Sequence, residues 1–157
     1  MQIGEEESNG FEFDLAGEIT PNWNILASYA YIDARITKTA SNSEKDFDMQ
    51  RPSTPRHSGN IWTKYIITEG PLKHLGFGAG YNFVTERYGQ VGRRANTTVY
   101  PGYGLVNAVL YYKINQIQLQ LNLNNILNKT HWVGGYDKLR SFPGAPRNVN
   151  ISISYKF

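Results

Sequence analysis

Two stretches of the sequence alternate strictly between apolar and polar residues, and they restrict what the chain can fold into. Ile and Leu alternate with Gln and Asn from Ile117 to Asn124, and apolar residues alternate with Asn, Ser and Lys from Val149 to Phe157. A period of two places the apolar side chains on one face of a β-strand and the polar side chains on the other. Both stretches therefore predict two-faced strands, whose apolar face meets either a protein core or lipid.

The same pattern predicts about seven antiparallel strands and an all-β fold. The expected strands are Phe11–Ile19, Trp23–Ile36, His57–Ile67, Leu75–Phe83, Tyr103–Lys113, Ile117–Asn124 and Val149–Phe157. In the fourth strand, Gly76, Gly78 and Gly80 share one face. Glycines at alternate positions indicate either a close approach to the backbone or a bend, and the sequence leaves both open.

The connections between these strands alternate between short and long. Short connections are expected at Thr20–Asn22, Thr68–His74 and Asn115–Gln116, and long ones at Thr37–Pro55, Glu86–Pro101 and Asn125–Arg147. Antiparallel strands bring all the short turns to one end and all the long loops to the other. Short periplasmic turns and long extracellular loops are typical of up-and-down transmembrane β-barrels of the bacterial outer membrane.

The composition of the 157 residues agrees with a membrane barrel and excludes several other classes. Cysteine is absent, which excludes disulfides and cysteine-based metal sites, and a net charge of +3 is too small to indicate a nucleic-acid partner. No apolar run approaches the roughly 20 residues of a membrane helix, whereas a membrane strand needs only about 9–11 residues. Residues 1–7 lack the basic and apolar regions of a secretion signal, so we expect a chain that is not exported or a piece of a longer protein.

Seven strands do not form a closed single-chain bacterial barrel, because such barrels have even strand numbers from 8 upward and an open edge is not viable in lipid. The sequence therefore predicts the C-terminal arc of a larger barrel. Two alternatives stay open. A small standalone barrel or pore with a structural or passive role needs an eighth strand from residues 1–9. A soluble β-sheet binding module would bury Ile117, Leu119, Leu121 and Leu123 in a protein core.

Short motifs that follow one another along the chain resemble those of a known family. Residues 23–34, WNILASYAYIDA, are similar to the family pattern W-x-L-x-A-S-Y-x-Y-x-D-A. The other matching segments are Ser8 to Glu12, Pro55 to Tyr65, Tyr100 to Ala108, Leu121 to Lys129, Pro143 to Arg147 and Ile153 to Phe157. Asn107 and Asn128 stand where the family usually has Asp. Together these motifs resemble the barrel of TonB-dependent outer-membrane receptors, in the ferric-siderophore branch.

The resemblance implies that residues 1–157 are the C-terminal segment of a 22-stranded barrel, without the N-terminal plug domain and the TonB box. It implies a receptor in the bacterial outer membrane that binds and takes up ferric siderophores, not an enzyme, with the siderophore as transported ligand and no other cofactor. The implied partners are outer-membrane lipid and lipopolysaccharide, the barrel-assembly machinery, and the TonB complex through the absent N-terminal region. No nucleic acid is expected.

The residues themselves contain no catalytic constellation, and His57, His74 and His131 lack the spacing of metal ligands. Two of the long loops are rich in basic residues, which favours an anionic ligand or lipopolysaccharide phosphates, although solvated charge explains them equally well. The loop candidates for ligand binding are Arg93, Arg94, Trp132, Tyr136 and Arg140. Trp132 and Tyr136 also suit an interfacial aromatic girdle. Tyr155 and Phe157 resemble the terminal signal that the barrel-assembly machinery reads, and they also suit lipid-facing positions.

Overall fold

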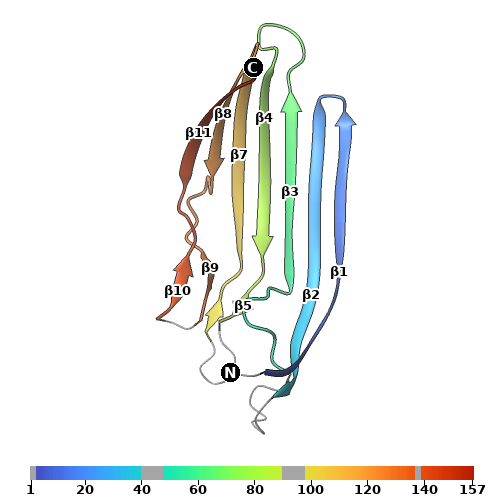
Figure 1. Cartoon of the computed structure of the whole chain (residues 1–157), viewed down its shortest axis with the longest axis vertical. Helices are drawn as coiled ribbons and strands as arrows, with labels where there is room; N and C mark the ends of the chain where they lie inside the picture. Colours follow the sequence, from blue (N-terminus) through green and yellow to red (C-terminus); the bar gives the residue numbers. More distant parts are fainter. Residues whose placement is uncertain (1–2, 40–47, 90–97, 137–138) are drawn as a thin grey trace.

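The computed structural model describes residues 3–39, 48–89, 98–136 and 139–157. Its main element is one antiparallel sheet of seven strands in the order β1-β2-β3-β4-β7-β8-β11, so that neighbours in this sheet also follow one another along the chain (Figure 1). The strands are β1 (Ile3–Thr20), β2 (Trp23–Thr39), β3 (His57–Ile66), β4 (Leu75–Val84), β7 (Tyr103–Ile114), β8 (Ile117–Asn124) and β11 (Asn148–Tyr155). The described residues contain no helix long and apolar enough to cross a membrane.

The strand register joins the apolar residues into continuous rows on one side of the sheet, here called the apolar face. One such row crosses six strands through successive cross-strand partners, Trp23, Tyr65, Phe77, Leu110, Leu121 and Ile151. These side chains have no second protein layer over them among the described residues, and Ile151 is 74% exposed. The soluble-module alternative, which needs a protein core against Leu121, therefore disagrees with the structure.

The opposite side, here called the polar face, carries a matching polar row. It runs through Asn24, Lys64, Gly78, Val109, Asn122 and Asn150. The side chains of Glu12, Asp14 and Glu18 on β1 lie on this face as well, by strand alternation. A sheet with one largely apolar and one largely polar face is the arrangement of a membrane barrel wall with a wet interior.

The short turns lie at one end of the sheet and the long connections at the other, as the sequence predicts (Figure 1). We call these the turn end and the loop end. The two-residue turn Asn115-Gln116 joins β7 to β8, with Asn115 at a positive φ of 51° that asparagine tolerates better than most residues. At the turn end Lys156 still donates a backbone hydrogen bond of 2.9 Å to Gln116.

Two strands extend further toward the loop end than the alternation indicates. β1 begins at Ile3 instead of Phe11, and β2 ends at Thr39 instead of Ile36, because their polar ends pair with each other through backbone hydrogen bonds. Residues 3–10 thus belong to β1 and do not form an eighth strand, which contradicts the standalone-barrel alternative. The last strand is shorter than expected, since β11 ends at Tyr155 and Phe157 lies beyond it.

The long connections also contain small sheets that the sequence does not reveal. β5 (Arg87–Tyr88) pairs with β6 (Val99–Tyr100), and β9 (Trp132–Gly135) pairs with β10 (Ser141–Pro143). Both pairs lie at the loop end (Figure 1). They give the loop end a defined structure on which candidate ligand-binding side chains are held.

Candidate functional site

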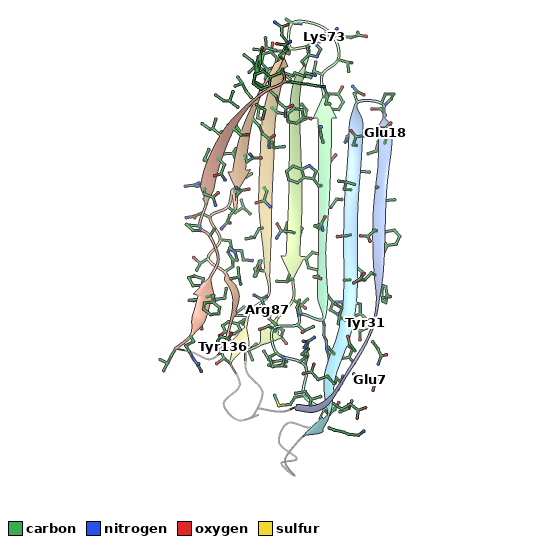
Figure 2. All side chains as sticks on the ribbon, in the orientation of Figure 1. Glu7, Glu18, Tyr31, Lys73, Arg87 and Tyr136 are labelled. Carbon is green, nitrogen blue, oxygen red and sulfur yellow. The ribbon has the colours of Figure 1, made fainter. Side chains whose placement is uncertain are left out.

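The β9–β10 hairpin carries three of the predicted ligand-binding residues and brings two of them, Tyr136 and Arg140, into contact. Trp132 begins β9, and Tyr136 and Arg140 lie at the hairpin's far end, where Tyr136 N donates to Arg140 O at 3.0 Å. The Arg140 guanidinium lies over the Tyr136 ring, 5.5 Å from its centroid, and Phe142 meets the same ring edge-on at 6.1 Å. Figure 2 shows Tyr136 at the loop end of the molecule. The other two candidates, Arg93 and Arg94, lie outside the described residues.

The hairpin presents a surface that is both aromatic and cationic. The exposed fraction of Tyr136 is 57%, and Trp132, Val133 and Phe142 are also exposed. A cation above an aromatic ring forms a favourable pair, and an exposed ring with a neighbouring guanidinium suits a ligand that combines flat apolar parts with negative charge.

A buried arginine that the sequence analysis did not select joins the two small sheets. Arg87 on β5 is only 3% exposed, and its Nη2 donates to the backbone carbonyl of Trp132 on β9. Its guanidinium also lies 5.3 Å from the ring centroid of Tyr103. Figure 2 places Arg87 close to the small strands at the loop end. Because the contact links residues 45 positions apart, no local pattern in the sequence indicates it.

Two further contacts hold the hairpin on the β5–β6 pair. The Tyr100 hydroxyl and Ser141 Oγ lie 3.1 Å apart, which links β6 to β10. A Cβ at Gly135 would collide with the Tyr100 ring, so the glycine permits β9 to lie against this side chain. The hairpin is therefore fixed by Arg87, Tyr100 and Ser141, while the Tyr136 end is exposed.

Asn125 anchors the start of the long connection that carries this hairpin. Its side chain accepts from Lys129 N at 2.9 Å and donates to Lys129 O at 2.9 Å and to Ala145 O at 3.1 Å. Its own N–H donates to Asn107 Oδ1 at 2.9 Å. Asn125 is buried and has a positive φ of 50°, a conformation that asparagine adopts more readily than most residues.

The histidines do not form a metal site in the described part of the chain. His131 is 7% exposed and packs on Tyr103 with ring centroids 4.5 Å apart, and its Nδ1 lies 3.1 Å from Lys129 O. His57 pairs with the Tyr29 hydroxyl at 2.7 Å. Across residues 3–39, 48–89, 98–136 and 139–157, no three His, Cys, Asp or Glu side chains are grouped so that they could hold a metal ion.

A second charged group at the loop end fixes the connection after β2. Arg35 pairs with Asp33 at 3.0 Å and with Asp48 at 2.8 Å, and Arg56 reaches Asp33 at 3.4 Å. The hydrogen bond to Asp48, followed by that to Asp33, holds the pKa of Arg35 above its ordinary value. These pairs are half-buried, and they hold Asp48 and Arg56 beside β2.

The two residues expected to carry the assembly signal lie at the turn end. Tyr155 ends β11 opposite Ile117, and its hydroxyl donates to Gln116 Oε1 at 2.7 Å. The Phe157 ring meets the Tyr155 ring edge-on with centroids 5.0 Å apart. Both rings are exposed, as residues at the edge of a lipid-facing band are expected to be.

Known proteins resemble this chain over nearly its whole length. The probable TonB-dependent siderophore receptor PiuA of Acinetobacter baumannii is 33% identical over 164 residues, covering 99% of this chain and 21% of that receptor. The ferrioxamine B receptor of Salmonella typhimurium is 30% identical over 160 residues, covering 99% of this chain and 22% of that receptor. The chain thus spans about one fifth of the length of these relatives.

Solved structures give the same match. The crystal structure of PiuA superposes with a TM-score of 0.80 at 32% identity, over 97% of this chain and 22% of that one. The ferric-catecholate import receptor Fiu of Escherichia coli superposes with a TM-score of 0.80 at 25% identity, over 97% of this chain and 21% of that one.

The family described as TonB dependent receptor-like, beta-barrel matches residues 1–126. The chain therefore belongs to the TonB-dependent receptors of the outer membrane, which are receptors and not enzymes, and forms a C-terminal part of their β-barrel.

Proposed function

We propose that this chain is the last part of a 22-stranded receptor that binds ferric siderophores and takes them up, with its plug domain and TonB box outside residues 1–157. The relatives, which include a probable siderophore receptor and a ferrioxamine B receptor, support this assignment. The observation on this chain that carries the proposal is the β9–β10 hairpin, where the Arg140 guanidinium stands over the exposed ring of Tyr136.

The hairpin suits a ferric chelate because such a ligand has a bulky, partly flat organic shell and often carries negative charge. Tyr136 and Trp132 provide exposed rings for the shell, and Arg140 provides charge beside one of them. Arg93 and Arg94, which lie outside the described residues, stay candidates from the sequence alone. This loop-end region would be the chain's share of the ligand site.

The remaining partners follow from the two faces and the two ends. The apolar face would contact outer-membrane lipid, with lipopolysaccharide near the loop end. Tyr155 and Phe157 at the turn end would contact the barrel-assembly machinery. The TonB complex would contact only the receptor's N-terminal region, which lies outside residues 1–157.

Growth of a strain whose only siderophore receptor is the full-length protein tests the proposal, with a panel of ferric chelates as iron sources under iron restriction. At least one chelate should support growth, and its binding to the purified receptor should weaken at least about tenfold in Tyr136→Ala and Arg140→Ala. Lys73→Ala, which changes a turn-end residue far from the hairpin in Figure 2, is the matched control and should leave binding unchanged. Failure of every chelate, or equal binding by all variants, would contradict the assignment.

A further inference from the structure

A pocket of about 660 Å³ lies at the loop end, between the segment that follows β2 and the segment that follows β4. Residues 48–50 line one side of it, Glu86 and Tyr88 line the other, and Arg56 and His57 at the start of β3 lie between them. Ser53 N donates to Tyr88 O at 2.7 Å, which joins the two segments. The lining found among the described residues includes none from the β9–β10 hairpin, so this pocket is separate from the proposed ligand site.

The first wall of the pocket lies on the same side of the sheet as the apolar face. Gln50 pairs with Arg35, which is four residues after Tyr31 on β2 and therefore shares its side of the sheet. Asp48 reaches the Arg35 guanidinium at 2.8 Å. His57 pairs with Tyr31 across β2 and β3, so it lies on this side as well. The side chains of this wall thus point away from the polar face.

The second wall points the same way. The Arg87 guanidinium lies 5.3 Å from the ring centroid of Tyr103, and Tyr103 pairs with Val84 on the polar-face side. Tyr88 follows Arg87 in β5, so alternation places its side chain on the opposite side, that of the apolar face. In a barrel with its apolar face on lipid, the pocket would therefore face outward and not into the interior.

The pocket begins where the apolar face ends. Phe11, Tyr31 and His57 form a row of rings across β1, β2 and β3, here called the aromatic row, and the next β2 side chain on this side is the charged Asp33. Tyr31 lies eight residues from Trp23 at the turn end of β2, which is roughly 20 Å at about 3.3 Å per residue and a tilt of about 40°. That is close to the height of a lipid-facing band, about 25 Å. The aromatic row therefore marks the boundary between lipid chains and headgroups.

The lining suits a neutral ligand that carries many hydroxyl groups. The carboxylates of Asp48 and Glu86 can accept hydrogen bonds, the Arg56 guanidinium can donate them, and the Tyr88 ring offers an apolar surface. Two carboxylates against one guanidinium disfavour a phosphate or another anion. A sugar hydroxyl both donates and accepts, and the C–H groups of a sugar ring can pack on the tyrosine. The chemistry therefore points to a sugar ring.

We propose that this pocket binds a sugar of a lipopolysaccharide molecule beside the barrel, while the acyl chains of the same molecule lie on the aromatic row. The proposal rests on the proposed function only in placing lipopolysaccharide against the loop end of the apolar face. The position of the pocket selects the lipid-bound sugar, because the lining faces outward and His57 belongs to both the pocket and the aromatic row. A soluble sugar would leave the exposed ring of Phe11 uncovered.

Binding of purified rough-type lipopolysaccharide to the full-length receptor, freed of lipid in detergent, tests the proposal. Glu86→Ala with Tyr88→Ala should weaken this binding at least about tenfold, because hydrogen bonds to a carboxylate and a ring contact are lost. Glu12→Ala is the matched control, since it removes a carboxylate beside Phe11 on the polar face, and it should leave binding unchanged. Equal binding by the parent and the double variant would overturn the proposal.

Two further ligands identify the part of the molecule that is bound. The lipid-free core oligosaccharide should bind at least about tenfold more weakly than the intact lipopolysaccharide, because no acyl chain then covers the aromatic row. Phosphatidic acid, which has acyl chains and a phosphate but no sugar, should also bind at least about tenfold more weakly. A core oligosaccharide that binds as well as the lipid would indicate a site for soluble sugars. Phosphatidic acid that binds as well would indicate a contact without sugar recognition, and either result would contradict the proposal.

A labelling experiment keeps the inference testable if the double variant folds poorly. Glu86 is exposed, so Glu86→Cys alone leaves the packing of the sheet intact. In native outer membranes this cysteine should react with a bulky water-soluble maleimide at least about tenfold more slowly than in phosphatidylcholine vesicles, because the bound sugar covers it. Leu139→Cys, at a site that is 96% exposed, should react equally fast in both membranes. Equal rates for Glu86→Cys in the two membranes would refute the assignment.

These outcomes are separate from those of the growth assay. A receptor that supports growth on a ferric chelate but binds lipopolysaccharide equally well with and without the pocket side chains would contradict the pocket assignment alone. A receptor whose double variant loses lipopolysaccharide, and whose parent supports growth on no chelate, would contradict the proposed ligand alone.

Discussion

Leu121 and Gln120 are neighbours on β8 whose side chains lie on opposite faces, and replacing each by arginine tests the lipid assignment of the apolar face. Leu121 lies between Leu110 on β7 and Ile151 on β11, and Gln120 lies between Tyr111 and Ser152 on the polar face. Both sites are at nearly the same depth. The pair therefore isolates the effect of the face from the effects of depth and local strand.

The depth of Leu121 sets the expected magnitude. It lies four residues from Ile117, where β8 begins beside Tyr155 at the turn end. At about 3.3 Å per residue and a tilt of about 40°, that is roughly 10 Å into an apolar band about 25 Å tall. Near the midplane a lipid-facing arginine costs about 2–4 kcal/mol. The folding equilibrium of Leu121→Arg should thus fall by roughly 30- to 900-fold, at about 1.36 kcal/mol per tenfold.

Urea-dependent folding of the full-length receptor into phosphatidylcholine vesicles measures this difference, with the gel shift between heated and unheated samples reporting the folded fraction. Gln120→Arg should stay within about 0.5 kcal/mol of the parent, as expected for a wet surface. Similar effects of the two substitutions, or a larger effect of Gln120→Arg, would refute a lipid-facing apolar face.

Three further substitutions test individual contacts. Gly80→Val should destabilise the receptor by about 1–3 kcal/mol through collision with the Trp62 ring, whereas Gly17→Val, where a Cβ meets open space, should not. Equal urea midpoints of the two variants would contradict the packing of the Trp62 ring against Gly80. Asn125→Ala should cost about 1–3 kcal/mol, because buried partners lose their hydrogen bonds, and limited proteolysis should then cleave residues 125–147 faster. Arg87→Ala should speed cleavage near β9 by detaching Trp132 from β5, and an unchanged cleavage pattern would show that Arg87 does not hold the hairpin.

The alternation of residue types was sufficient to predict the seven strands of the sheet and the segregation of short and long connections. Ile117–Asn124 matches β8 at both ends, because each residue of that stretch follows the period of two. The extension of β1 to Ile3 could not be predicted, since residues 5–9 are all polar and their pairing depends on the backbone of β2. The small strands β5, β6, β9 and β10 have only two to four residues each, which is too short to show any period.

The role of the glycines of β4 follows from the cross-strand register and not from the sequence pattern alone. The sequence leaves open whether Gly76, Gly78 and Gly80 permit a bend or a close approach. Cross-strand pairing answers this, because it sets the rings of Trp62 and Tyr111 directly beside Gly80 and Gly76. Neither ring is near Gly76 or Gly80 in the sequence, so only the register of three neighbouring strands reveals the contact. The same limit applies to Arg87, whose importance depends on its distant partner Trp132.

The odd number of strands in this sheet restricts how the sheet can close into a barrel in a membrane. β1 and β11 are the two edges among the described residues, each paired on one side only. In an antiparallel sheet of seven strands the first and the seventh run in the same direction, so these edges cannot pair with each other in an antiparallel ladder. Unpaired backbone groups in lipid cost several kcal/mol each, so both edges need partners. An all-antiparallel closed barrel that contains this sheet therefore needs an odd number of additional strands, a condition that the 15 remaining strands of a 22-stranded receptor barrel would meet.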